Sequence, residues 1–341
     1  MKLKLYLRTI LALLPAVILF SGCSAIKDDE PRPCPQGLEI RFVYDYNLER
    51  ANAFPAQVDC LTLHIYDADG NFVRTLTESG APLSDEDYRM RVDNLPEGRY
   101  RLVAYGGALC QAASFSYTAG EPAGSSHVSE LGMRLNPECL EAGNPLGRLH
   151  DHFYGTVMAD VEIRPELTRV TVKMMKNTNH LRIMLQHLDY VALDGADYMF
   201  EITDDNTLFD CDNDLLEAGD VTYTPWERGS VKTGNAEFGA AGSQVEVQMA
   251  YADLSISRLM TKRSPKLVVT HLPSGEQIIS IPLNNYLLAL RGSHYDWTTE
   301  QEFLDRKSDW NLFFFLDEDR HWNKTFIRVD DWIVRINDIN A

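Results

Sequence analysis

Leu38-Glu39-Ile40-Arg41-Phe42-Val43-Tyr44-Asp45-Tyr46 is the stretch that best predicts the fold, because its apolar and polar side chains alternate. Every second side chain is apolar and would lie on one face of a strand: Leu38, Ile40, Phe42, Tyr44 and Tyr46. The charged side chains of Glu39, Arg41 and Asp45 would lie on the opposite face. This period of two predicts a half-buried β-strand, since a helix would repeat its apolar positions every three to four residues.

The same alternation recurs along the chain, as in Leu61, Leu63 and Ile65 and later in Leu181, Ile183 and Leu185. Turn sequences such as Asp67-Ala68-Asp69-Gly70-Asn71 separate the alternating segments and predict hairpins. Only two short helices are expected, near residues 284–290 and 299–307, with Thr298 or Thr299 capping the second. Many short strands and few helices predict an all-β fold.

The length of the chain, 341 residues, favours two β-sandwich domains. The polar stretch 176–179 interrupts the alternation and is the predicted boundary, with domains at residues 36–177 and 178–341. Residues 106–130, rich in Gly, Ala and Ser, are expected to form a long connection, and residues 204–242 a surface excursion.

The N-terminus has the features of a bacterial lipoprotein signal. Lys2, Lys4 and Arg8 precede a mostly apolar run over residues 10–20, which is too short to span a bilayer. Ser21-Gly22-Cys23 then predicts removal of residues 1–22 and acylation of Cys23. Phe20 departs from the Leu or Ile usual three positions before such a cysteine. The alternative is an ordinary secretory signal with an incidental cysteine.

Residues 23–35 are predicted to form a tether, because three consecutive acidic residues, 28–30, are followed by prolines at positions 31, 33 and 35. The acidic residues resemble an export signal of surface lipoproteins, although a merely solvated linker has the same composition. Without the leader and its three basic residues, the formal net charge changes from −18 to −21. A chain with this negative charge would repel nucleic acid and anionic lipid surfaces. Neither is therefore expected as a partner.

The cysteines other than Cys23 are odd in number, so they cannot all pair within one chain. An oxidising compartment allows one or two disulfides, and the nearest neighbours in sequence are Cys34 with Cys60 and Cys110 with Cys139. This pairing would leave Cys211 free, but the sequence leaves the connectivity open. No Cys-x-x-Cys is present to indicate a zinc ribbon or a thioredoxin-like site.

Several polar clusters could in principle carry chemistry, but none matches a complete motif. His150-Asp151-His152 lacks a third ligand at a defined spacing, and Asp210, Asp212 and Asp214 begin a calcium loop without its Gly and Glu. Acidic pairs are expected by chance among 50 acidic residues, and no catalytic motif occurs. The tryptophans could form a sugar platform, but large aromatics more often fill cores: Trp226, Trp297, Trp310, Trp322 and Trp332. We therefore expect no enzyme activity, cofactor, metal or small-molecule substrate.

Several of these segments, in order along nearly the whole mature chain, resemble the FimB/Mfa family of fimbrial anchor subunits. The matching blocks lie at residues 28–47, 54–73, 95–107, 153–157 and 310–332 and include Leu95-Pro96-Glu97-Gly98 and Phe153-Tyr154-Gly155. The resemblance implies two tandem transthyretin-like β-sandwiches without an active site. It also implies a lipid-anchored protein of the outer membrane, at the base of a fimbrium, whose partners are pilin subunits and which limits the length of the shaft.

The resemblance further implies growth by strand addition, in which polymerising subunits lose an N-terminal strand by cleavage after an Arg. Cutting this chain at Arg41 or Arg50 would separate its body from the lipid, so we expect the strand from Leu38 to Tyr46 to be retained. Whether the strand at residues 332–336 is donated or retained stays open. The alternatives are a surface carbohydrate-binding lipoprotein of a polysaccharide-uptake system and a lipoprotein hydrolase.

Overall fold

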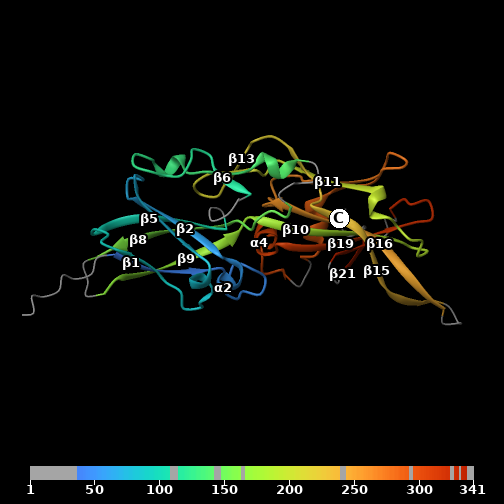
Figure 1. The fold of residues 1–341 in the computed structure, drawn as a ribbon, viewed down its shortest axis with the longest axis horizontal. Coiled ribbons are helices and arrows are strands. Elements are labelled where there is room, and N and C mark those ends of the chain that lie inside the picture. Colours follow the sequence, from blue (N-terminus) through green and yellow to red (C-terminus); the bar gives the residue numbers. More distant parts are fainter. Residues whose placement is uncertain are drawn as a thin grey trace, which may run out of the picture.

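The computed structural model describes residues 37–107, 114–141, 147–162, 166–238, 243–291, 295–322, 326–329 and 332–335. The chain is mainly β, which confirms the predicted fold class, and it is elongated, with one large sheet towards each end of its long axis (Figure 1). Within the described ranges no helix is both long and apolar enough to cross a membrane.

The first large sheet has seven strands in the order β3-β2-β5-β8-β9-β1-β4. Their bounds are β1 (Gly37–Val43), β2 (Cys60–Asp67), β3 (Phe72–Ser79), β4 (Met90–Asp93), β5 (Gly98–Gly106), β8 (Phe153–Val161) and β9 (Thr168–Lys176). Apolar residues from β1, β4 and β9 share one buried cluster with residues from β2 and β5, so the sheet curls around its own core.

The second large sheet has six strands in the order β15-β16-β10-β19-β20-β21. Their bounds are β10 (Thr178–His187), β15 (Glu227–Phe238), β16 (Ser243–Ser257), β19 (Asp309–Leu316), β20 (Phe326–Val329) and β21 (Trp332–Arg335). Each large sheet contains a parallel pair, β1 with β9 in the first and β10 with β19 in the second, whereas its other described pairs are antiparallel.

Two four-stranded sheets complete the fold. One consists of β14 (Val221–Tyr223), β11 (Tyr198–Asp204), β17 (Lys266–His271) and β18 (Glu276–Pro282), and its apolar residues pack with those of the six-stranded sheet in a second core. The other consists of β13 (Leu215–Leu216), β12 (Leu208–Phe209), β7 (Met133–Leu135) and β6 (Phe115–Tyr117). Because β12 pairs with β7, residues before and after the predicted boundary share this small sheet.

The helices are short. Those at α3 (Leu283–Ala289) and α4 (Glu300–Arg306) were predicted from the sequence, whereas α2 (Phe54–Gln57) was not. The hydroxyl of Thr299 accepts a hydrogen bond from the backbone N–H of Glu302 at 3.1 Å, which confirms Thr299 as the cap of α4. The single turns of 3₁₀ helix are η1 (Ala81–Ser84), η2 (Val128–Glu130), η3 (Pro137–Leu140) and η4 (Gly195–Asp197).

Two long segments differ from the expectation. Residues 204–242, expected to be a surface excursion, contain β12 to β15, and the last of these extends the six-stranded sheet. Residues 106–130, expected to be a connection, contain β6. The strands in these segments were not predicted, because the segments are rich in polar and small residues. The strands pair with residues far away in sequence, such as Phe209 with Met133. The division at residue 177 and the transthyretin-like topology stay predictions.

Candidate functional site

Strand β1 lies inside the seven-stranded sheet, with paired neighbours on both sides. It runs parallel to β9 from Leu38 opposite Thr168 to Val43 opposite Lys173, and antiparallel to β4 from Gly37 opposite Asp93 to Ile40 opposite Met90. The space between β9 and β4, which we call the β1 seat, is therefore filled by the chain's own first strand. This confirms that the segment from Leu38 forms a strand, although β1 ends at Val43 rather than at Tyr46.

The inward face of β1 is a large part of the first core. Leu38 and Ile40 have no exposed surface and Phe42 is 2% exposed. Each such side chain stabilises the fold by roughly 1.5–3 kcal/mol when fully buried. Tyr44 continues this face beyond the strand and meets Phe153 edge-on, with ring centres 5.1 Å apart. Removal of β1 would therefore open a deep apolar groove in the sheet.

The start of β1 fits its seat only with glycine. Gly37 has a φ of +145°, and a Cβ atom at this position would lie 1.8 Å from the backbone oxygen of Val92 in β4. On the outer face, the ion pairs Arg169–Glu39 and Lys173–Asp45 link β1 and the residues after it to β9. These pairs are exposed and contribute little to stability, so the apolar face and the backbone hold β1 in place.

The segment that follows β1 is folded tightly against the body. The side chain of Asn47 donates to the backbone oxygens of Tyr44 at 3.0 Å and Ala51 at 2.8 Å. The side-chain oxygen of Asn52 accepts from the backbone N–H groups of Tyr44 and Phe54. These bonds close a compact loop between β1 and α2.

Two stacked arginines join this loop to the second half of the chain. The guanidinium of Arg306, on α4, lies 4.1 Å from the ring centre of Tyr46. The guanidinium of Arg50 lies 3.6 Å from the ring centre of Trp297, and Arg306 lies 5.6 Å from the same ring. We call these four residues the clamp. Cation–π contacts of this kind contribute roughly 0.5–2 kcal/mol each.

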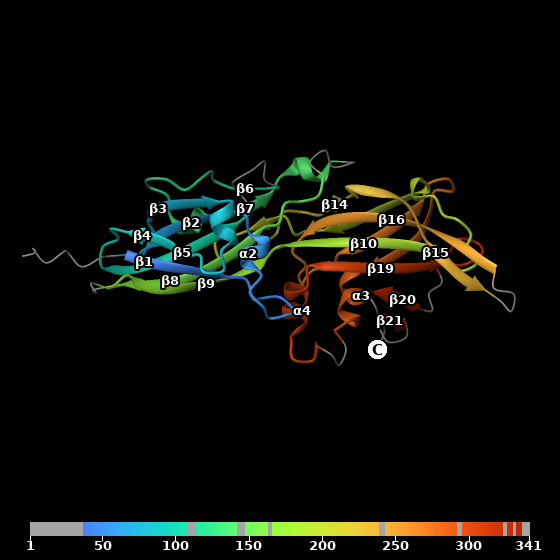
Figure 2. The same ribbon diagram turned by 60° about the horizontal axis from the view of Figure 1, so that its bottom comes forward.

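The passage from the first large sheet to the second is a single buried residue. β9 ends at Lys176 and β10 begins at Thr178, and Figure 2 shows the two strands following one another along the long axis. The side-chain amides of Asn177 and Asn213 exchange hydrogen bonds of 2.7 and 3.1 Å. The backbone N–H of Asn177 donates to the oxygen of His152 at 2.7 Å. A link so short and so fully hydrogen-bonded is a rigid connection.

A buried ion pair lies beside this link. Asp151 lies 2.9 Å from the ammonium of Lys176, whose side chain is 3% exposed, and 2.7 Å from Nε2 of His180. Burial alone would raise the pKa of Asp151, but the hydrogen bond from His180 and the charge of Lys176 outweigh it and hold that pKa well below its ordinary value. Asp151 therefore stays ionised, and it ties β9 and β10 to the loop before β8.

The cysteines are placed as follows. Cys60, at the start of β2, is disulfide-bonded, and its partner is not among the described residues. Cys23, Cys34 and Cys110 all lie outside the described residues. Cys139 is buried in η3 and carries a free thiol 3.9 Å from the backbone oxygen of Ser114. The expected pairing of Cys110 with Cys139 is therefore wrong. Nearness in sequence misled here, because η3 turns this side chain into the second core. Cys211 is free.

The polar clusters that match no complete motif in the sequence have structural roles in the fold. His152 is fully buried and stacks on Phe115 with ring centres 4.5 Å apart. Burial lowers the pKa of His152 to about 3. A carboxylate oxygen of Asp210 accepts from the backbone N–H groups of Asp212 and Asp214, which closes a turn. Within the described ranges no three His, Cys, Asp or Glu side chains gather closely enough to hold a metal ion.

The described tryptophans do not form one platform. Trp310 and Trp322 are buried in the second core, Trp297 belongs to the clamp, and Trp226 lies half-buried before β15. Trp332, in β21, is the fifth. Sequence reasoning missed the clamp, because nothing in the pattern of residues 44–53 points to α4.

Comparison with known proteins identifies relatives along almost the full chain. The family model for fimbrillin-A associated anchor proteins Mfa1 and Mfa2 matches residues 30–338. A Bacteroides thetaiotaomicron protein described as an adhesin shares 45% identity over 90% of this chain and 100% of its own, with a TM-score of 0.82. A second protein of that organism, described as polysaccharide-binding, shares 30% identity over 90% of this chain and 100% of its own, with a TM-score of 0.72.

The fimbrial anchor protein Mfa2 from Porphyromonas gingivalis has the same fold, with a TM-score of 0.62 at 15% identity over 89% of this chain and 99% of its own. None of the curated proteins compared matches the chain.

Proposed function

The chain belongs to the family of fimbrillin-A associated anchor proteins Mfa1 and Mfa2, and from this premise we propose that it anchors a fimbrial shaft to the outer membrane and limits the length of that shaft without catalysis. Its partners would be pilin subunits on one side and the membrane on the other. The single observation that carries this proposal is the occupied β1 seat, since an occupied seat leaves no groove for the strand of a further subunit.

The lipid would be attached at Cys23, after removal of residues 1–22. The 14 positions from Cys23 to Gly37 span at most about 50 Å when fully extended. The membrane contact and β1 would thus belong to one short segment. A pull on the shaft would be transmitted to the lipid through the strand that closes the groove.

Retention of β1 is supported by the surroundings of Arg41 and Arg50. These are the two arginines at which cleavage would separate the body from the lipid. Arg41 lies within β1 and pairs with Thr171 of β9, so its backbone is part of the sheet. Arg50 has a φ of +54° and its guanidinium is stacked on Trp297. A protease must draw an extended, unpaired segment and a free arginine side chain into its active site. The backbone at Arg41 is paired within the sheet, and the side chain of Arg50 is stacked on Trp297.

The arrangement of strands suits a protein under tension. Force entering at β1 would pass sideways into β9 over six paired positions, then along β9 and β10, and from β10 into β19 over eight. These parallel neighbours resist in shear, where many backbone hydrogen bonds must break together. The hydrogen-bonded link at Asn177 joins β9 directly to β10, with no loop between them that could extend under force.

The pairing of the last strand supports its retention in its own chain over its donation to a neighbouring subunit. β21 pairs with β20 of its own chain, from Phe326 opposite Arg335 to Val329 opposite Trp332 (Figure 2). We therefore propose that the shaft subunit binds without taking β21.

The proposal is tested by replacing Cys23 with Ala in the native host and imaging the fimbriae. Longer filaments, or filaments shed into the medium, are the expected outcome. Filaments that stay attached at normal length and never co-purify with this protein would refute the proposal.

A further inference from the structure

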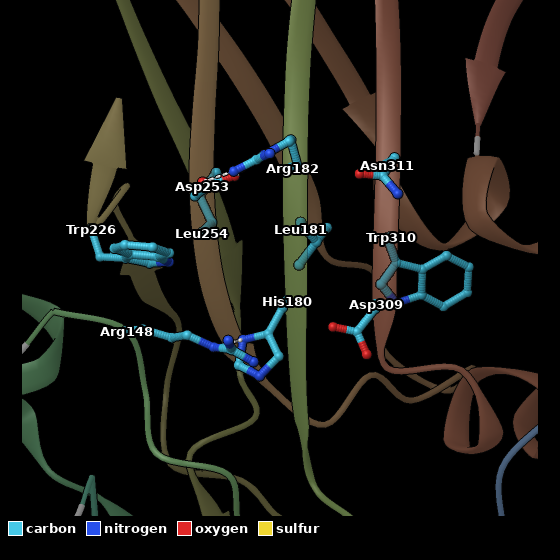
Figure 3. A pocket seen from close by; sticks show the side chains of 10 residues that line it. All are labelled: Arg148, His180, Leu181, Arg182, Trp226, Asp253, Leu254, Asp309, Trp310 and Asn311. Carbon is cyan, nitrogen blue, oxygen red and sulfur yellow. Dashed lines mark hydrogen bonds and ion pairs between the residues drawn. The ribbon is translucent and has the colours of Figure 1, made fainter. Parts of the chain in front are cut away.

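A shallow groove of about 300 Å³ lies on the outer face of the six-stranded sheet (Figure 3). Its floor crosses β16, β10 and β19, on the face opposite the buried side chains of Leu181 and Ile183. The indole of Trp226 forms one side, and Asp309 and Asn311 of β19 form the other (Figure 3). A second hollow of about 430 Å³ adjoins it and shares Arg182 and Asn311.

Polar groups in this groove are held in fixed directions. Arg182 donates to both carboxylate oxygens of Asp253, at 2.8 and 2.6 Å, and Asp253 has only 8% of its side chain exposed. Arg148 donates from Nε to Nδ1 of His180 at 3.2 Å. The groove therefore presents donors and acceptors whose positions are set before any ligand arrives.

The loop that carries the aromatic wall is tied to the sheet, and the indole has a donor that no described residue accepts from. The backbone N–H of Trp226 donates to the oxygen of Asp253 at 3.0 Å, which ties its loop to β16. Among the hydrogen bonds of the described residues, none uses the indole N–H of Trp226. In the adjoining hollow, the ring of Tyr251 lies 5.6 Å from the guanidinium of Arg182 and its hydroxyl donates to Glu227 at 2.9 Å.

The groove is unsuited to a peptide strand. β10 runs through the middle of the floor and is paired with β16 on one side and with β19 on the other, so its backbone groups are already used. A ligand on this face must be recognised by side chains alone. It needs a flat apolar surface for Trp226 and several hydrogen-bonding groups for the polar floor.

The charge of the groove narrows the class of ligand. Arg148 and Arg182 are balanced by Asp253 and Asp309, so the arginine and aspartate side chains of the lining carry no net charge. The whole chain has a net charge of −18, which would repel a polyanion. A neutral ligand fits best, and the volume lies within the roughly 300–1,000 Å³ of small-ligand sites.

We propose that this groove binds a neutral oligosaccharide, with one pyranose ring stacked on Trp226. The C–H face of the sugar would cover the indole, and its hydroxyl groups would bond to Arg182, Asp253 and Asp309. Tyr251 would contact a following sugar unit. This site does not depend on the anchoring role, because it shares no residue with the β1 seat or the clamp.

Isothermal titration calorimetry of the full mature chain tests the proposal, with maltohexaose, cellohexaose and mannohexaose as neutral probes and a chondroitin sulfate hexasaccharide as the anionic probe. Saturable binding of at least one neutral probe is expected, with a Kd of roughly 1 mM or below. Trp226→Ala should weaken it about tenfold or more, and Trp226→Phe should retain part of it. Leu272→Ala, an exposed apolar residue outside the groove and the clamp, should bind as the unmodified chain does.

Three outcomes would overturn the proposal. These are no saturable binding of any neutral probe, binding of the sulfated probe alone, and binding that Trp226→Ala leaves unchanged. Thermal melting of each variant shows whether it is folded, and Trp226→Phe serves as the reference if Trp226→Ala melts early.

Discussion

Arg306 of α4 and Tyr46 after β1 are in direct contact: the guanidinium lies 4.1 Å from the ring centre. The same guanidinium donates to the backbone oxygens of Asp45 at 3.3 Å and Asn47 at 3.2 Å, across 261 positions of sequence to Asp45. The end of the first strand is thus attached to the second half of the molecule directly, in addition to the covalent path through β9 and β10.

Replacing Arg306 with Ala should loosen the segment after β1. The variant loses a stacked cation and two charge-assisted hydrogen bonds, which predicts a loss of about 1–3 kcal/mol in the free energy of unfolding. Limited proteolysis should cut within residues 45–52 faster than in the unmodified chain. Lys262→Ala, a change of an exposed cation, is the control and should leave both measurements unchanged. Equal proteolysis of both variants would contradict the role of the clamp.

Replacing Ile40 with Ala should destabilise the first core strongly. Ile40 has no exposed surface in β1, so truncation leaves a cavity and predicts a loss of about 2–5 kcal/mol, measured by urea unfolding. Arg41→Ala changes the next residue of the same strand on its exposed face and should cost less than about 0.5 kcal/mol. Similar losses for the two variants would show that β1 does not fill its seat in solution.

Asp204→Asn should stabilise the protein at neutral pH. Burial, the largest cause, raises the pKa of Asp204 to about 6, and its Oδ2 atom has no hydrogen-bond partner. A raised folded-state pKa favours folding at low pH, and this stabilisation is lost as the pH rises from 3.8 to about 6. The substitution removes the buried charge and should add on the order of 1–3 kcal/mol at pH 7.5.

The gain should vanish near pH 4, where Asp204 is protonated in the folded protein. Thermal melting at both pH values is the measurement, and Asp319→Asn, an exposed carboxyl, is the matched control. A gain of equal size at pH 4 and pH 7.5 would exclude titration of Asp204 as its cause.

The disulfide of Cys60 should join it to Cys34. Peptide mapping without reduction is expected to show one linked peptide that contains both residues, and Cys60→Ser should cost about 2–4 kcal/mol. Cys139→Ser, at a free buried thiol, should cost less. A linked peptide that joins Cys60 to Cys110 would contradict this prediction.

The sequence predicted those parts of the fold that depend on local pattern. Alternation identified β1, β2 and β10, and a capping threonine with acidic residues in the next turn identified α4 within one residue of each end. The strands β12 and β13 could not be predicted, because they are two residues long and are held by pairing with each other and with β7. The parallel pairing of β1 with β9 has no signal in either strand, since it depends on how the chain closes around its core.

The candidate site was predictable only in part. The importance of the segment from Leu38 to Tyr46 followed from its pattern and its distance from Cys23. The contacts that hold the next loop did not, because Arg306 and Trp297 lie about 250 positions later and an arginine near the end of a short helix is unremarkable in sequence. The free thiol of Cys139 was equally invisible, since sequence spacing does not give the direction of a side chain.

Retention of the first strand on the lipid is tested most directly by mass spectrometry of the protein recovered with fimbriae from the outer membrane. We expect an acylated N-terminal residue at Cys23 and an uncut chain from Cys23 through Arg50. A mature N-terminus at Phe42 or Ala51, produced by cleavage after Arg41 or Arg50, would contradict it, because the first strand would then be absent or separated from the lipid.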